Sequence, residues 1–394
     1  MRRDAVSPYF AALKDVRNYF ALLVLLVLSC AGQQPNREYL MYAGTYTRTA
    51  SKGIYAWRFQ PSTGKLTTLG LMAETAHPSF LAVHPNHRFL YATNEHENAT
   101  EPGNTITAYA MDASTGKLIL LNKVSSRGVG PCHISIDKTG KTLVVANYGS
   151  GSVASFPILP DGRLGEAVSF FQHHGSSINK DRQQGPHAHC AVISPDNRFV
   201  LVADLGADEV FSYRLNSEKA VLQANDPPSI HLTSGWGPRH LVFHPNGKVV
   251  FLVSEIGSRL TSLSYDSDRG TLRELQSVST LPRDFTGVST AAEVQVDHSG
   301  RFVYASNRGD NSIAVFSVDP KNGALALVEH VSTQGRTPRN FSLDPTGSWL
   351  FAANQDSGSI AIYRVDSESG RLKPFGGLVK DAPEPSQVLF VTGE

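Results

Sequence analysis

Eight side chains that can transfer protons or bind anions fall at matching places along this chain, beside short apolar runs. A histidine or glutamate can take a proton from water as it attacks a carbonyl carbon, while an arginine binds an anionic group and stabilises the developing oxyanion. Such a set is suited to hydrolysis of a small anionic ester or lactone. The catalytic candidates are His187, His189, Arg239 and Glu255, and the substrate-binding candidates are His133, Glu293, Arg308 and Arg339.

Other catalytic arrangements have less support in the sequence. A Gly-x-Ser-x-Gly motif is absent, and Gly149-Ser150-Gly151-Ser152 has the wrong spacing for a nucleophile. A metal site that joins the histidines to Glu255 is disfavoured, because arginines in the same pocket would repel a cation. We therefore expect neither a metal nor another cofactor. Cys132 and Cys190 lack metal-ligand spacing and are expected to be free buried thiols, with a disulfide between neighbouring blades as the alternative.

The elements that must position these side chains come from a repeat. A proline phrase, an apolar run, a turn, a second apolar run and then Asn or Asp recur at intervals of 47 to 55 residues. Seven copies of a strand-rich repeat near fifty residues are typical of a β-propeller with one four-stranded blade per copy. The predicted fold class is therefore all-β, a seven-bladed β-propeller. The anchors of the copies are Pro78, Pro131, Pro186, Pro238, Ala291, Pro338 and Pro385.

The two ends of the repeat predict how the ring closes. The last copy supplies one strand, at 385–391, whereas three strands near the start, at 39–44, 53–59 and 66–70, lack an inner partner. We expect the C-terminal strand to pair with the N-terminal ones. That pairing completes one blade and removes a sheet edge that would otherwise be exposed.

The candidate residues occupy two equivalent places in the repeat, at the start of the first strand and just after the second. In an antiparallel blade these places lie side by side, and in a propeller they surround one mouth of the central channel. We therefore expect Arg239 to lie near Glu255. By the same reasoning Glu293 should lie near Arg308.

Two further features of the repeat concern this mouth. Because alternate residues of a strand share a face, the imidazoles of both His187 and His189 are expected to face the channel. A ring of small polar residues ends the second strand of each copy, and we expect it to be structural, bonding backbone N–H groups of the next turn. Its members are Asn94, Asn147, Asp204, Ser254, Asn307 and Asn354.

Composition agrees with one propeller domain over residues 38–394. The 394 residues include 33 glycines and 22 prolines, enough for the turns, and 41% hydrophobic residues, enough for a large core. Lysine and arginine number 36 against 35 aspartates and glutamates, so the net charge is +1. That balance gives no electrostatic reason to expect a nucleic acid as a partner.

Residues 1–30 predict an export signal. A basic start precedes the apolar segment 19–28, and Ser29-Cys30 follows it. Residues 27–30 resemble a bacterial lipobox, so we expect a lipid anchor at Cys30, a short linker at 31–37, and a place in the periplasm or outer membrane. A simple signal peptide or an uncleaved anchor is the alternative, and a misassigned start would leave the protein in the cytoplasm.

Several phrases of the chain are jointly distinctive. They are Tyr42-Ala43-Gly44-Thr45-Tyr46-Thr47, Gly53-Ile54-Tyr55, Gly185-Pro186-His187-Ala188-His189, Gly237-Pro238-Arg239-His240, Ser254-Glu255 and Ser306-Asn307-Arg308-Gly309. Together they resemble the seven-bladed propeller lactonase family, which includes bacterial 6-phosphogluconolactonases and fungal carboxymuconate cyclases. The resemblance implies opening or closure of a lactone ring without a metal. The histidine, glutamate and two arginines of the cyclase branch would correspond to His189 or His187, Glu255, Arg239 and Arg308.

We therefore expect a carboxylic ester hydrolase that opens a sugar lactone to the acid, similar to 6-phosphogluconolactonase. Since export would separate the enzyme from phosphorylated sugars of the cytoplasm, an unphosphorylated or extracellular lactone is the expected substrate. The alternatives are a non-enzymatic surface propeller that serves as a binding platform and a metal-dependent hydrolase. The side chains of the mouth differ from blade to blade, which favours an enzyme. The oligomeric state is not predicted.

Overall fold

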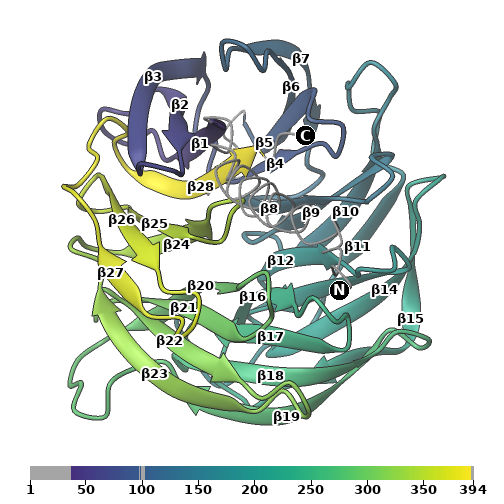
Figure 1. Ribbon diagram of the computed structural model, residues 1–394. Helices are drawn as coiled ribbons and strands as arrows, with labels where there is room; N and C mark the ends of the chain where they lie inside the picture. The colour runs from purple at the N-terminus through teal and green to yellow at the C-terminus, as the bar shows by residue number, and fades with distance from the viewer. Residues whose placement is uncertain (1–36, 97, 99–102, 392–394) are drawn as a thin grey trace, which may run out of the picture. The chain divides into compact units, whose positions relative to one another are not determined.

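Every named element is a β-strand in the computed structural model, which describes residues 37–96, 98 and 103–391. These strands form seven antiparallel sheets of four strands each (Figure 1). The seven-bladed propeller predicted from the repeat is therefore confirmed. The expected export signal, with Cys30, and residues 31–36 of the expected linker lie outside the described residues. Within the part described, no helix is long and apolar enough to cross a membrane.

Each blade is a meander that runs from an innermost strand at the channel to an outermost strand at the rim. In that order, the blades are β28 (Pro385–Val391), β1 (Tyr39–Thr45), β2 (Gly53–Gln60) and β3 (Lys65–Glu74); β4 (Leu81–Val83), β5 (Phe89–Asn94), β6 (Thr105–Met111) and β7 (Leu118–Ser125); β8 (Pro131–Ile136), β9 (Thr142–Asn147), β10 (Ser152–Pro157) and β11 (Ser169–Gln172); β12 (Ala188–Ile193), β13 (Phe199–Asp204), β14 (Glu209–Asn216) and β15 (Val221–His231); β16 (Pro238–Phe243), β17 (Val249–Ser254), β18 (Arg259–Asp266) and β19 (Thr271–Ser279); β20 (Thr290–Val296), β21 (Phe302–Arg308), β22 (Ser312–Val318) and β23 (Leu325–Ser332); and β24 (Pro338–Leu343), β25 (Trp349–Asn354), β26 (Ser359–Val365) and β27 (Leu372–Pro374).

The ring closes through its two ends. Strand β28 pairs with β1 in antiparallel register, with Tyr42 opposite Leu389 and Leu40 opposite Val391. Figure 1 shows the yellow β28 beside the purple β1. The expected closure is therefore confirmed, and β1 has a partner on both edges.

The apolar core lies between neighbouring blades. Seven clusters of buried side chains fill the seven contacts between blades. At the closure, the ring of Phe59 contacts those of Phe351 and Phe390 at centroid distances of 4.9 and 5.8 Å. All six residues of β9 and all six of β25 are buried. Second strands are apolar on both faces because a neighbouring blade covers each face.

A β-bulge near the start of the innermost strand sets the direction of the mouth residues. In β16, Pro238 pairs with Ser254 and His240 with Val253, so that Arg239 is an extra residue without a partner in β17. A bulge redirects a side chain without ending the ladder, and bulges are common beside active sites. The corresponding extra residues in four other blades are Cys132, His189, Arg339 and Ser386.

The same register corrects one anchor of the repeat. Ala188 pairs with Asp204 and therefore occupies the place of Pro131 and Pro238; the assignment of Pro186 was wrong by two residues. The turn is a better reference point for aligning the copies, because Asn197, with φ of 63°, follows Ala188 by nine residues (197 − 188). The turn glycines of the neighbouring blades also have positive φ and follow their anchors by nine residues.

The ring of Asn residues is structural, but through a different contact from the one expected. The side-chain amides of Asn147, Asn307 and Asn354 donate to the carbonyls of Ser126, Thr280 and Thr333, at 3.2, 2.7 and 2.8 Å. These carbonyls belong to the segments that enter each blade, so each amide ties a blade to its own connection. Among bonds between described residues, Asp204 follows the expectation, because its carboxylate accepts N–H groups of the following turn.

Candidate active site

Glu255 organises the charged part of the channel mouth. This residue is 3% exposed, and it pairs with three arginines. Its Oε2 lies 2.9 Å from Arg239 Nε and 2.7 Å from Arg308 Nη2, and its Oε1 lies 2.6 Å from Arg182 Nη2. Burial alone would raise the pKa of Glu255, but the arginines hold it well below its usual range. The carboxylate therefore stays ionised at neutral pH and serves as a fixed counter-charge.

One expected pairing is confirmed and the other is wrong. Arg239 lies against Glu255 as predicted. Arg308 also pairs with Glu255 rather than with Glu293. The reason is the register, because Arg308 stands opposite Thr290 at the start of β20, whereas Glu293 lies three residues further along an irregular stretch.

His189 is the base candidate that the structure brings to the pocket. It is buried, it lines the cavities described below, and its ring centroid lies 5.3 Å from that of Tyr148. Its Nδ1 lies 3.8 Å from Cys132 Sγ, a free thiol as predicted. Burial and then the charge of Arg239 lower the pKa of His189 well below its usual value. The imidazole is therefore neutral at pH 7 and can accept a proton.

His187 is not brought to the same place. Its Nδ1 lies 2.9 Å from the backbone carbonyl oxygen of Tyr148, and its ring stacks on the Tyr148 ring with centroids 4.6 Å apart. It lines neither cavity of the mouth. His187 lies before β12, which begins at Ala188, and His189 is the bulged residue of that strand. The alternation of a regular strand therefore does not place the two imidazoles on one face.

A deeper layer of the channel contains His133, Glu293 and Arg339 of the predicted set. Glu293 Oε2 lies 3.2 Å from His240 Nδ1 and accepts a hydrogen bond from Asn340 Nδ2. The rings of His133 and His240 meet at a centroid distance of 5.4 Å. Arg339 lines both cavities of the mouth. Each side chain comes from a different inner strand, as the ring prediction requires.

Two connected spaces result. The outer pocket has a volume of about 250 Å³, and the inner cavity has a volume of about 10 Å³. Glu95, His189 and Arg339 line both, so these residues form the boundary between them. The outer pocket is also lined by Tyr148, Arg182, Glu255, Thr290 and Arg308. The inner cavity is also lined by Ser79, Phe80, Cys132, Arg239, His240, Asn340 and Ser386.

Sequence reasoning missed Arg182 as a site residue. It lies in the long connection between β11 and β12, which has no counterpart in the other repeats, so comparing copies could not find it. Glu95 and Tyr148 were also left out, although they follow the second strand at the same place as Glu255. Tyr46 donates to Glu95 Oε2 at 2.8 Å and lies beneath Arg339. The shared place in the repeat was the signal for Glu95 and Tyr148.

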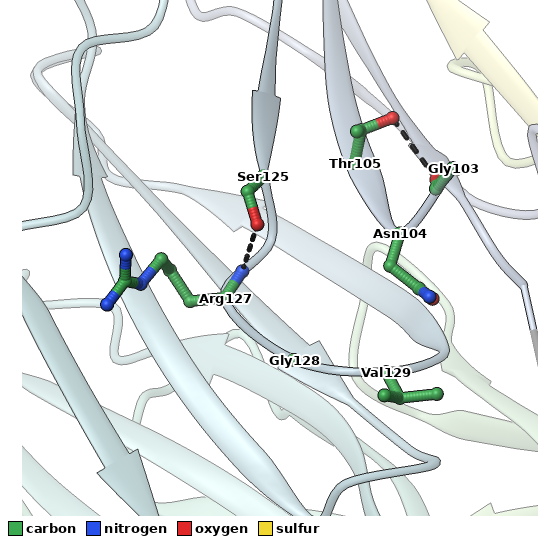
Figure 2. Close-up of a pocket in the computed structure, with 7 residues that line it drawn as sticks. All are labelled: Gly103, Asn104, Thr105, Ser125, Arg127, Gly128 and Val129. Atoms are coloured by element: carbon green, nitrogen blue, oxygen red, sulfur yellow. Dashed lines mark hydrogen bonds between the residues drawn. The ribbon is translucent and has the colours of Figure 1, made fainter. Parts of the chain in front are cut away.

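A larger hollow lies elsewhere, beside the ends of β6 and β7 (Figure 2). Its volume is about 490 Å³, and Arg127 is the one ionisable side chain among the described residues that line it. Figure 2 shows the backbone N–H of Arg127 bonded to Ser125 Oγ and the hydroxyl of Thr105 bonded to the Gly103 carbonyl. A hollow without an acid–base pair offers no proton transfer. The candidate active site is therefore the channel mouth. Across the described part of the chain, no group of three His, Cys, Asp or Glu side chains is placed to hold a metal ion.

Comparison with known proteins decides the family. The model of the seven-bladed β-propeller lactonases matches residues 40–390. The chain belongs to this lactonase family. This lactonase is 38% identical over 304 residues to a 6-phosphogluconolactonase of Bacillus subtilis, with 77% of this chain and 84% of the relative covered. It is 34% identical over 309 residues to a 6-phosphogluconolactonase of Formosa agariphila, covering 77% and 86%.

A solved structure agrees with this assignment. The lactonase superposes on the periplasmic gluconolactonase of Pseudomonas aeruginosa with a TM-score of 0.85 and 34% identity, covering 90% of this chain and 99% of the other. The expectation of a lactone-hydrolysing enzyme is therefore confirmed, and a small-molecule lactone is its substrate. The family resemblance noted in the repeat phrases is confirmed as well.

Proposed function

We propose that this lactonase opens a sugar lactone to the acid by attack of a water molecule that His189 activates. The observation that carries the proposal is a neutral, buried imidazole beside a cluster of arginines, at the edge of a 250 Å³ pocket. The volume suits a single sugar ring, and the polar lining suits its hydroxyl groups.

In the proposed reaction, water attacks the lactone carbonyl carbon while His189 takes one of its protons. The carbonyl oxygen becomes an oxyanion, which the guanidinium groups of Arg308 and Arg182 stabilise. The ring C–O bond then breaks, and the proton returns to the departing oxygen, which becomes the free hydroxyl of the acid. No covalent intermediate with the protein is required.

Glu255 has a positioning role in this proposal rather than the role of a base. Both of its oxygens are paired with guanidinium groups, which hold its pKa well below its usual range and leave it poorly placed to take a proton from water. Its two oxygens hold Arg182, Arg239 and Arg308 in place. Preorganised donors of this kind need little rearrangement as charge develops on the substrate.

The names of the relatives suggest two substrates. The Bacillus subtilis relative is named for 6-phosphogluconolactone, and the Pseudomonas aeruginosa structure is named a periplasmic gluconolactonase. Because residues 1–30 read as an export signal, we propose that the chain is exported and acts on an unphosphorylated or extracellular sugar lactone. Arg308 and Arg339, which line the outer pocket, would then bind hydroxyl or carboxylate groups.

The test is a kinetic comparison of gluconolactone and 6-phosphogluconolactone with the purified full-length chain. We expect hydrolysis above the rate in buffer, with higher kcat/KM for gluconolactone. His189→Gln should lower kcat by about 100-fold or more, whereas His187→Gln, the control on the same segment, should change it less than about threefold. If neither lactone is hydrolysed faster than in buffer, the proposal is wrong.

We also propose that Cys30 carries a lipid that anchors the protein to a membrane. Mass spectrometry of the N-terminal peptide, together with fractionation of cells that produce the parent chain or Cys30→Ala, tests this. The parent should be in the membrane fraction and the variant in the soluble exported fraction. An unmodified Cys30 in the membrane fraction would favour an uncleaved anchor.

A further inference from the structure

The inner cavity lies beneath the pocket in which we place the substrate. Its volume of about 10 Å³ is roughly what one water molecule needs. The cavity is polar enough to hold that water, because His189, Arg239, His240 and Arg339 line it. His189 lies at its upper boundary, since this residue also lines the outer pocket.

One ring nitrogen of His240 has no hydrogen-bond partner among the described residues. Its Nδ1 lies 3.2 Å from Glu293 Oε2, but its Nε2 is buried and makes no hydrogen bond with any described residue. A buried polar atom without a partner is costly, which favours a water molecule or a transferred proton at that position. The rings of His189 and His240 meet edge to face with centroids 5.2 Å apart, and both residues line the inner cavity, so one water in that cavity can contact both.

Glu293 is the group of this site that can hold a proton. It is as buried as Glu255, at 6% against 3% exposed, yet it forms no ion pair with an arginine in the described part of the chain. Asn340 and the backbone N–H of Val294 hold its two oxygens. Burial raises the pKa of Glu293 to about 7, although the charge of Arg239 opposes this rise. The other ionisable groups that face the pair are His133, His189, Cys190, Glu255, Arg308 and Arg339.

We propose that His240 and Glu293 form a buried proton-accepting pair that serves His189 through the water of the inner cavity. This inference rests on the proposed role of His189 in lactone hydrolysis. His240 and Glu293 do not contact the substrate in this scheme, so they act as positioning and proton-holding residues behind the base.

The proton balance of the pair is simple. In the resting state Glu293 is ionised, and His240 carries its proton on Nδ1. A proton that leaves His189 passes through the water to His240 Nε2, while the Nδ1 proton moves to Glu293 Oε2. The result is a neutral carboxylic acid and a neutral imidazole, so no buried imidazolium is formed. The reverse shift returns the proton to the oxygen released when the ring C–O bond breaks.

This route is favoured by the charges around the site. Burial and then Arg239 lower the pKa of His189 and also that of His240, so a positive charge on either ring is disfavoured. Transfer to Glu293 instead neutralises a buried negative charge. Two neutral groups are cheaper to bury than one unpaired ion.

The experiment combines infrared titration with kinetics on the full chain and on Glu293→Gln. In the parent, a buried carboxyl band should disappear as the pH rises through about 7, and kcat should rise over the same interval, because only ionised Glu293 can accept the proton. Glu293→Gln should lack that band, lose the rising limb of the pH profile, and lower kcat about tenfold to 100-fold with KM unchanged.

Two further variants make the result decisive. Glu329→Gln, the same substitution in the same blade but on the outermost strand β23, where Glu329 pairs with Arg371, should keep the parent's profile and kcat. His240→Gln should keep a titrating carboxyl band but lower kcat, because the path to Glu293 is cut. If Glu293→Gln does not fold, Glu293→Asp replaces it and should retain a titrating band with a reduced kcat.

The outcomes separate this inference from the proposed function. The proposed proton-accepting pair is wrong if no carboxyl titrates near neutral pH. It is also wrong if Glu293→Gln leaves kcat and the pH profile unchanged. If the parent hydrolyses no lactone, the proposed function is wrong, and so is the proposed transfer of a proton from His189 to this pair. In that case the infrared titration still decides whether Glu293 holds a proton near neutral pH.

Discussion

Glu255 and Glu293 are two buried carboxylates from neighbouring blades of one channel, and they differ in their neighbours rather than in their depth. Glu255 is surrounded by Arg182, Arg239 and Arg308, whereas Glu293 is held by His240 and an amide. Burial raises the pKa of both, but only the arginines of Glu255 reverse the effect. Exposure alone therefore does not assign a role to a carboxylate; its ion pairs do.

The largest expected effect is that of Glu255→Gln. Removing the charge leaves three guanidinium groups facing one another without a counter-charge, which should lower the free energy of unfolding by about 3 to 5 kcal/mol. Because Glu255 has a depressed pKa, its contribution in the parent is constant at neutral pH and is lost only as the pH falls towards that low pKa. Urea unfolding at pH 7 measures the loss.

The control for this prediction is Glu218→Gln, which removes the exposed partner of Lys141. An exposed pair contributes about 1 kcal/mol or less. If Glu255→Gln costs no more than this control, the arginine cluster does not depend on its carboxylate, and the contrast with Glu293 fails.

A smaller effect of opposite pH dependence is expected for Glu293→Gln. With a pKa of about 7 in the folded state and 4.5 as the reference value, the folded protein retains a proton that the unfolded chain releases. The parent should therefore lose stability as the pH rises through this interval, by on the order of 3 kcal/mol. Glu293→Gln should lack that loss. Unfolding curves at pH 5 and pH 9 measure it, and parallel changes in parent and variant would contradict it.

The smallest effect on stability is expected for Arg182→Met. The Arg182 side chain is 39% exposed and shares Glu255 with two less exposed arginines, so its loss should change the free energy of unfolding by about 1 kcal/mol or less. Its guanidinium lines the substrate pocket and is proposed to stabilise the oxyanion, so kcat for the lactone should fall about tenfold. Lys180→Met, an exposed change in the same loop, is the control. A kcat equal to that of the control would show that Arg182 does not stabilise the oxyanion.

The sequence predicted the framework of this comparison but not its chemistry. Repeat copies aligned on their turns placed Arg239 beside Glu255, because antiparallel pairing converts equal spacing into proximity. The same alignment could not show that Arg308 pairs with Glu255 rather than with Glu293, since the pairing depends on an irregular stretch in β20. Arg182 escaped altogether, because a loop outside the repeat supplies it.

The bulges explain the other difference between expectation and structure. Regular alternation predicts that His187 and His189 share a face, but an extra residue at the start of β12 separates them. Bulges have no distinct residue signature in this chain, since Cys132, His189, Arg239, Arg339 and Ser386 all occupy them. They became visible only from the pairing of one strand with the next.

The closure of the ring also sets an order of events during synthesis of the chain. Strand β28 follows the other described strands in the chain, yet it supplies the innermost position of the blade that begins with β1. Until residues 385–391 have been made, β1 lacks its inner partner, and Phe59 lacks its contact with Phe390. Six blades form from strands that are consecutive in the chain, whereas the seventh needs strands from both ends of the propeller and is therefore the last to be completed.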